Sequence, residues 1–312
     1  MRPSSRARWV FPPRLAPGAR VALITPAGPV DEARIGRAAA RLRRLGLEPV
    51  EGRGIRTRAA YLAGDDDTRA ADLEWAFRAR DIDGVWSLRG GYGSMRLWGR
   101  LPLDALRARP RPFLGFSDNT SLHLAALRQR VVSFHGPHAG ADRFPAMAAA
   151  CIRAVVFEPQ PAGVLPPAGS GPSPEALVGG RAEGRLVGGN LSLLAAAAGT
   201  PFALEARGGI LVLEDVDEAV YRVDRMLEQL LASGALAGVR ALALGRFTNI
   251  DASGRGRPLR AVLQEFARRL DVPTLVDLPF GHVPDSWTLP LGTRARMDAE
   301  AGTLEILEPA VR

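Results

Sequence analysis

The order of strand-like and helix-like segments constrains the fold of this chain more than any other feature. Residues 20–26 form an apolar run that ends in a Pro/Gly turn, which is typical of a buried strand. From about Asp31 to Leu45 apolar residues recur at helical spacing, and Gly46 follows as a C-cap. Further strands are expected at 47–50, 84–88 and 112–116, with helices that end near residue 80 and that span 119–130. This alternation predicts a parallel sheet with helices on both faces.

The regular alternation stops near residue 150. Residues 158–180 are rich in Pro, Gly and Ser and are expected to form a linker or a long surface connection. Shorter apolar runs follow at 209–213, 241–246 and 304–307, mixed with helical segments. The sequence therefore predicts an α/β N-terminal domain (1–157), the linker (158–180) and a smaller β-rich α+β C-terminal domain (181–312).

The chain has a formal net charge of +8, and all of its 41 basic residues are arginine. These arginines are spread among acidic residues, without the sustained basic run or the basic aromatic face of a nucleic-acid binder. We therefore expect a solvated basic surface and no nucleic-acid partner. Because lysine is absent, Schiff-base catalysis, pyridoxal-phosphate chemistry and a P-loop lysine are excluded.

Neither export nor membrane insertion is predicted. The basic N-terminus contains Pro3, Pro12 and Pro13 and lacks the apolar stretch of a secretory signal. No apolar run approaches the ~18 residues that a membrane-spanning helix needs. Cys151 is the only cysteine, so an internal disulfide and a cysteine-cluster metal site are both impossible. These features predict a cytoplasmic protein that does not associate with membranes.

Two turns that follow neighbouring expected strands are candidates for catalysis. Ser117 stands between a strand and a helix, where its hydroxyl would be exposed beside free backbone N–H groups. Asn119 departs from the G-x-S-x-G pattern of general hydrolases, and a Ser or Asp before a helix, such as Ser117 or Asp118, is most often an N-cap. The glycine turn at 90–93 follows the preceding strand. It could supply an oxyanion donor, cradle a phosphate or be a plain tight turn.

A carboxylate and a histidine in the C-terminal half could complete such a site. Glu214 follows the apolar run 209–213, and the end of a buried strand would hold a carboxylate rigidly. Glu214 or Asp215 could instead cap the helix expected from about residue 218 to 231. His282 lies in a loop after the apolar run 274–279, and a loop histidine on a rigid scaffold suits proton transfer near neutral pH.

Metal binding has less support in the sequence. His135 and His138 have the spacing of a ligand pair, but no third ligand is apparent nearby. His123 lies inside an expected helix and is interpreted as structural. The acidic run 65–67 precedes another helix, and a helix N-terminus favours negative charge, so this position explains the run better than a metal site. We expect neither a metal nor a cofactor.

Short motifs occur in a specific order along most of the chain. They are RVALITPAGP (20–29), AGD (63–65), RAADL (69–73), RGGYG (89–93), GFSD (115–118), GGNLS (188–192), LED (213–215), GH (281–282) and LPLG (289–292). In this order and spacing they resemble the serine LD-carboxypeptidases of peptidoglycan recycling and their relatives that confer immunity to microcin C7.

The resemblance implies a flavodoxin-like N-terminal domain, a smaller β-rich C-terminal domain and an active site in the cleft between them. Ser117 would be the nucleophile, His282 the general base and Glu214 the carboxylate that orients His282. The backbone N–H groups of Gly91 and Asp118 would form the oxyanion hole. A homodimer is the usual assembly in the family and is expected here.

The resemblance also implies a substrate class. The recycling enzymes release the terminal D-alanine of the murein tetrapeptide by cutting after the L-centre of meso-diaminopimelate. Arg89, beside the glycine turn, is the candidate partner for the carboxylates of this small peptide. The microcin-immunity relatives cleave peptidyl or aminoacyl nucleotide conjugates, for which Trp287 could stack the base, although ordinary packing explains Trp287 more simply. An alternative of another class is a non-enzymatic nucleotide-binding domain on a flavodoxin-like scaffold.

Overall fold

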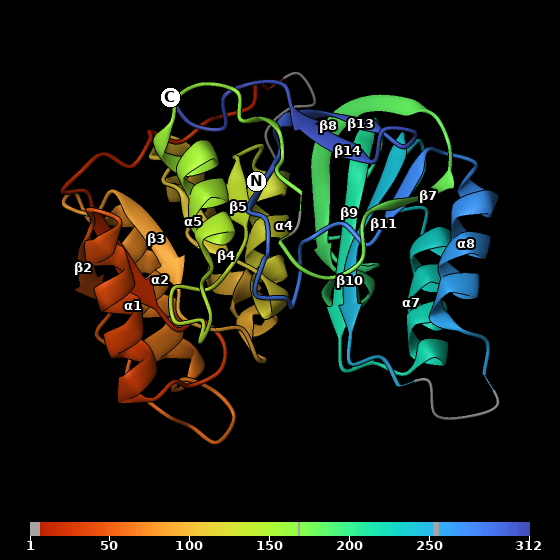
Figure 1. The fold of residues 1–312 in the computed structure, drawn as a ribbon. Helices are drawn as coiled ribbons and strands as arrows, with labels where there is room; N and C mark the ends of the chain where they lie inside the picture. The colour runs from red at the N-terminus through yellow and green to blue at the C-terminus, as the bar shows by residue number, and fades with distance from the viewer. Residues whose placement is uncertain (1–6, 168, 252–255) are drawn as a thin grey trace.

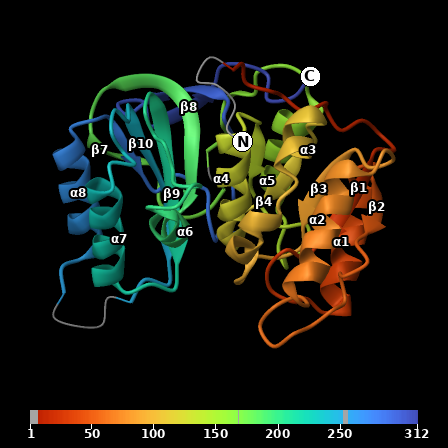
Figure 2. The same ribbon diagram turned by 180° about the vertical axis from the view of Figure 1, so that it is seen from behind.

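The structure is a computed structural model that describes residues 7–167, 169–251 and 256–312. It contains two sheets that lie side by side, each with its own helices (Figures 1 and 2). The N-terminal sheet is mostly parallel and the C-terminal sheet is mixed and β-rich, so the α/β class predicted from the sequence is confirmed. In the described residues, no helix is both long and apolar enough to cross a membrane.

The first sheet has six strands in the order β12-β5-β4-β3-β1-β2. Five of them run parallel, and β12 pairs with β5 in the antiparallel sense. The strands are β1 (Arg20–Ile24), β2 (Glu48–Glu51), β3 (Gly84–Ser87), β4 (Phe113–Gly115), β5 (Ser133–His135) and β12 (Leu289–Leu291). The helices of this half are α1 (Glu32–Arg44), α2 (Asp66–Arg78), α3 (Leu103–Ala108), α4 (Thr120–Arg128), α5 (Ala146–Ile152), the 3₁₀ segments η1 (Ser94–Arg100) and η2 (Ser117–Asn119), and the π segment η3 (Arg153–Phe157).

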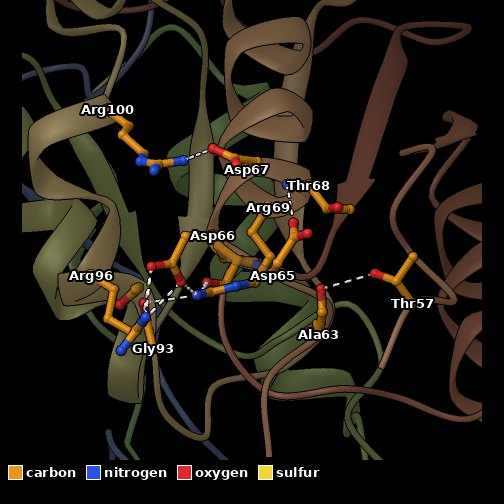
Figure 3. Close-up of polar contacts among 12 residues, drawn as sticks. Thr57, Ala63, Asp65, Asp66, Asp67, Thr68, Arg69, Gly93, Arg96 and Arg100 are labelled. Carbon is orange, nitrogen blue, oxygen red and sulfur yellow. Dashed lines mark hydrogen bonds and ion pairs between the residues drawn. The ribbon is translucent and has the colours of Figure 1, made fainter. Parts of the chain in front are cut away.

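Local sequence explains where the first helices begin and end. Asp31 caps α1 by accepting the N–H of Arg34 at 2.7 Å, and the chain leaves the helix through Gly46 with φ of +82°. Asp65 caps α2 in the same way by accepting the N–H of Thr68 (Figure 3). The acidic run at 65–67 is therefore a helix N-terminus, as expected.

The second sheet has eight strands in the order β6-β14-β13-β8-β9-β10-β11-β7. The four strands β8 to β11 are parallel, and each flanking strand pairs with its neighbour in the antiparallel sense. The strands are β6 (Gly163–Val164), β7 (Glu175–Val178), β8 (Arg181–Asn190), β9 (Gly209–Val216), β10 (Ala241–Thr248), β11 (Thr274–Val276), β13 (Arg294–Asp298) and β14 (Thr303–Ile306). The helices are α6 (Leu191–Ala197), α7 (Val220–Ala232) and α8 (Leu259–Leu270).

The central strand β9 shows why this sheet is stable. Leu211 and Leu213 pack into the cluster formed with α6, α7 and α8, while Ile210 and Val212 pack into the cluster on the opposite face. Apolar side chains on both faces are typical of buried parallel strands, and each side chain of this size contributes ~1.5–3 kcal/mol on burial. The continuous run GILVL therefore follows from burial on both sides.

Three segments depart from simple expectations based on composition. Residues 158–180, expected to be a linker, include β6 and β7, which pair at the two edges of the second sheet. β12 belongs by sequence to the C-terminal half but pairs with β5 of the first sheet. Residues 277–288 therefore cross from one sheet to the other. The proposed division into domains at 157 and 181 stays a prediction.

Candidate active site

The strand order brings the two predicted turns together. β3 and β4 are adjacent and parallel, so the segments that follow them emerge at the same edge of the sheet. Ser117 opens η2 with one residue between it and the end of β4, and its φ of +59° lies in the left-handed region that residues other than glycine seldom adopt. This backbone strain is found at sharp turns that expose a functional side chain.

The glycine turn after β3 lies directly against Ser117. A Cβ atom added to Gly90 would be 3.0 Å from both Cβ and Oγ of Ser117 and 3.3 Å from the backbone nitrogen of Asp118. These distances are tighter than ordinary Cβ contacts, so the close approach favours glycine at this position. Gly91 has φ of +105°, and its N–H has no acceptor among the described residues. Of the two predicted oxyanion donors, Asp118 directly follows Ser117, and Gly91 lines the same cavity as Ser117.

His282 links Ser117 to Glu214. Its Nε2 lies 3.0 Å from Ser117 Oγ, and its Nδ1 lies 2.7 Å from Glu214 Oε2. Because the Glu214 carboxylate accepts, Nδ1 carries the proton and Nε2 is left to accept from the serine hydroxyl. Glu214 is fully buried, so its position is rigid.

Glu214 lies within β9, two residues before its last residue, Val216, whereas the apolar run 209–213 had suggested that the strand ends there. β9 continues to Val216 because β8 and β10 pair beyond Leu213, with Asn190 opposite Glu214. The neighbouring Asp215 accepts from the Asn190 side chain at 2.9 Å and from the Ser192 hydroxyl at 2.6 Å. Asp215 therefore anchors the start of α6, and Glu214 is the carboxylate beside the histidine.

The surroundings of His282 make it a stronger base than an ordinary histidine. Burial lowers the pKa of His282, but the hydrogen bond to Glu214 and the negative charges of Glu214, Asp215 and Asp217 raise it more. The net result is a pKa above the usual 6.5. A raised pKa strengthens the base and also reduces the neutral fraction near pH 7.

The other three histidines are buried beside the site. His123 contacts the Gly115 carbonyl and the Ser133 hydroxyl, each at 2.8 Å, so it is structural as predicted. His138 Nε2 accepts from the Asn119 side chain at 3.1 Å. Burial lowers the pKa of His123 to about 4 and that of His138 to about 3. Within the described part of the chain, no three His, Cys, Asp or Glu side chains are grouped to hold a metal ion, so His135 and His138 lack a third ligand.

Ser117 and His282 open into a cavity of about 400 Å³ whose rim is basic. Arg34, Arg89 and Arg143 all line it. Arg89 also donates to the Pro29 carbonyl at 2.9 Å, which fixes its direction. Arg34 and Arg143 were not identified from the sequence. The chain has 41 arginines, and nothing in the sequence distinguishes those that face a common cavity.

Two aromatic residues near the site, Phe116 and Trp287, have different surroundings. The Phe116 ring lies 4.7 Å from the His282 ring and 4.4 Å from the His138 ring, so it forms one wall of the cavity. Trp287 is 2% exposed, packs in the core and donates to the Pro166 carbonyl at 2.8 Å. The stacking role considered for Trp287 is therefore wrong, and the packing interpretation is right.

Comparison with known proteins gives consistent matches along the chain. Residues 21–136 match the LD-carboxypeptidase N-terminal domain, and residues 183–297 match the LD-carboxypeptidase C-terminal domain. The murein tetrapeptide carboxypeptidase of Pseudomonas aeruginosa is 37% identical over 310 residues, which cover 95% of this chain and 97% of the relative.

Solved structures agree in fold. Muramoyltetrapeptide carboxypeptidase from Oxalobacter formigenes superposes with a TM-score of 0.80 at 32% identity, covering 93% of this chain and 100% of that one. MccF in complex with glutamyl sulfamoyl guanosine superposes with a TM-score of 0.87 at 24% identity, covering 97% and 99%. The second likeness shows a shared fold alone.

Proposed function

This chain belongs to the serine peptidase family of the LD-carboxypeptidases, and from that premise we propose that it hydrolyses an L–D amide bond and releases the terminal D-alanine of the murein tetrapeptide. The observation that carries the proposal is the continuous hydrogen-bonded series Ser117–His282–Glu214, which opens into a basic cavity. Serine is a weak nucleophile until a positioned base removes its proton, and this series supplies that base.

In the proposed first step, Ser117 Oγ attacks the carbonyl carbon of the scissile amide while its proton passes to His282 Nε2. The carbonyl oxygen becomes an oxyanion, which the N–H groups of Gly91 and Asp118 stabilise. Collapse of this intermediate breaks the C–N bond, and His282 returns the proton to the leaving amine. Free D-alanine departs and an acyl ester remains on Ser117.

In the second step, water attacks the ester with His282 again acting as base, and the shortened peptide is released with Ser117 regenerated. Glu214 keeps the histidine in one tautomer and stabilises the imidazolium through its charge. Each oxyanion donor lowers the barrier by ~3 kcal/mol. No cofactor enters either step.

The substrate assignment is supported by relatives and by charge. The Pseudomonas aeruginosa relative is named for the murein tetrapeptide, and the Oxalobacter formigenes structure for the muramoyltetrapeptide. Three arginines around the cavity suit a peptide with several carboxylates, and we assign Arg89 to one of them. We expect the enzyme to work in the cytoplasm as a homodimer, and light scattering tests the dimer.

Cleavage of peptidyl or aminoacyl nucleotides is the alternative. Burial of Trp287 removes the one aromatic residue that had suggested a stacked base. A non-enzymatic domain that only binds a nucleotide would not require the contact between Ser117 and His282. We therefore keep cleavage of peptidyl or aminoacyl nucleotides as an outcome of the test below.

The test is release of free D-alanine from L-Ala-γ-D-Glu-meso-diaminopimelate-D-Ala by the native protein, by Ser117→Ala and by the control Ser233→Ala, which does not line the cavity. We expect turnover by the native and control proteins and a loss of at least about 1,000-fold in Ser117→Ala. Unchanged turnover in Ser117→Ala would exclude the nucleophile. A native protein that is silent on the tetrapeptide but cleaves an aminoacyl sulfamoyl nucleoside would instead support the alternative.

A further inference from the structure

An arginine is buried behind the glycine turn. Arg69, on α2, exposes 1% of its side chain. Burying a guanidinium is costly unless its charge is paired and its donors are hydrogen-bonded, so a buried arginine requires specific partners.

The contacts of Arg69 run to two loops at once. Its Nη1 donates to the Pro26 carbonyl at 2.7 Å. The same Nη1 donates to the Gly93 carbonyl at 2.8 Å (Figure 3). Its Nη2 pairs with Asp66, whose carboxylate also binds Arg96 at 2.8 Å. Asp66 therefore neutralises the guanidinium, and Nη1 donates to both loop carbonyls, while the buried Nε has no partner among the described residues.

The two loops that Arg69 holds are those that meet at the candidate oxyanion hole. The loop that begins at Pro26 leads to Gly28, whose N–H donates to the Gly90 carbonyl at 3.0 Å. A Cβ atom added to Gly91 would be 3.3 Å from Gly28 Cα, so the two backbones are in contact. Gly93 ends the turn that contains Gly91. One side chain thus fixes both the turn and the loop behind it.

The same peptide group is held from the opposite side. Arg69 binds the carbonyl of the Gly93–Ser94 peptide, and the Asp118 carboxylate accepts the N–H of Ser94 at 2.8 Å. The Ser94 hydroxyl donates to the Asp118 carbonyl at 2.5 Å. Gly93 also has φ of +126°, so no other residue would adopt this conformation without strain.

We infer that Arg69 is a positioning residue that holds the N–H of Gly91 in register with the N–H of Asp118. The inference rests on the proposed function, because it takes these two groups as the oxyanion donors. Such donors act when negative charge develops in the transition state, and small displacements reduce their effect. Loss of Arg69 therefore lowers kcat and leaves KM for the peptide nearly unchanged.

Two readouts test the inference. The first is kcat and KM for D-alanine release. The second is the rate at which a fluorophosphonate labels Ser117, located by mass spectrometry. In the labelling reaction Oγ bonds to phosphorus, fluoride leaves and the hydroxyl proton passes to His282, while the phosphoryl oxygen occupies the oxyanion hole. Labelling needs no murein peptide, so it reports on Arg69 even if the substrate assignment fails.

The variants form matched pairs. Arg69→Met removes the guanidinium, and Arg69→Lys keeps the charge but not the forked donors. Asp66→Ala removes the carboxylate that binds Arg69. Its control is Asp67→Ala, which removes a neighbouring acid of the same helical turn that pairs only with Arg100 in the described residues.

We expect Arg69→Met to lower both kcat and the labelling rate by about 10- to 100-fold, with KM within about threefold of native. Arg69→Lys recovers part of the loss. Asp66→Ala shows a smaller loss in the same direction, and Asp67→Ala none. The inference is overturned if folded Arg69→Met and Asp66→Ala keep native labelling rates, or if KM rises while kcat does not change. Should Arg69→Met not fold, the Asp66→Ala and Asp67→Ala pair decides.

Discussion

At the scale of single residues, the charge around His282 decides how the candidate site behaves with pH. Only the neutral imidazole accepts a proton from Ser117. Glu214 raises the pKa of His282 against the effect of burial, so the protein gains basicity at the cost of activity in mild acid.

The first prediction follows from this balance. In native protein kcat/KM should rise with pH through a midpoint above 6.5, as protonated His282 becomes neutral. Glu214→Gln should lower kcat by at least about 100-fold, because the imidazolium loses its counter-charge. It should also move the midpoint to lower pH, since burial is then opposed only by the charges of Asp215 and Asp217. A pH profile from 5 to 9 measures both effects.

The control for Glu214 is Asp217→Asn. Asp217 is exposed and acts on His282 only through distant charge, so this variant should keep near-native kcat with a small shift of the midpoint. A Glu214→Gln variant that retains native kcat would show that Glu214 is not the orienting carboxylate.

At the scale of elements, the basic rim of the cavity is assembled from separate parts of the first sheet. Arg34 comes from α1, Arg89 from the turn after β3 and Arg143 from the segment after β5. Asp142 pairs with Arg34 at 3.4 Å and with Arg37 at 2.6 Å, so part of the charge of Arg34 is already balanced. Arg89 has no carboxylate partner among the described residues.

We therefore predict that Arg89→Gln raises KM for the tetrapeptide by about 10-fold, the effect of losing one charge-assisted hydrogen bond, with a smaller effect on kcat. Arg37→Gln is the matched control, because Arg37 binds Asp142 but does not line the cavity. Steady-state kinetics of both variants decides. Equal KM values in the native and Arg89→Gln proteins would remove Arg89 from the substrate contacts.

At the scale of the whole molecule, buried histidines lie where the two sheets are joined. His135 is on β5, opposite Leu289 of β12, and its ring lies 6.4 Å from Phe280 of the crossing segment. Neither ring nitrogen of His135 has a hydrogen-bond partner among the described residues, and burial holds its pKa well below 6.5. The folded protein therefore keeps this imidazole neutral.

This arrangement predicts acid sensitivity with a defined sign. Below pH 6.5 the unfolded chain takes up a proton on His135 that the folded protein does not, so the free energy of unfolding decreases as pH falls. Each such histidine should cost ~1.4 kcal/mol between pH 7.5 and 5.5. Between the same two pH values, the free energy of unfolding of His135→Phe should decrease by about that much less than that of the native protein. Urea unfolding at the two pH values measures the difference, and an equal loss in both proteins would contradict the assignment.

The sequence by itself determined the features that depend on neighbouring residues. The caps at Asp31 and Asp65 and the strand–helix order of the first 130 residues follow from short-range propensity and apolar spacing. The candidates Ser117, Glu214 and His282 were identified from the sequence because each occurs in a short motif of a recognisable family.

Only the tertiary structure decided which distant segments meet. β9 extends past Leu213 and β12 returns to the first sheet because strand pairing is satisfied by partners far along the chain. Arg69 is buried because carbonyls 43 and 24 residues away accept its hydrogen bonds, a relation that no local pattern records. Composition reports the preferences of a segment, whereas pairing and burial depend on what the rest of the fold places beside it.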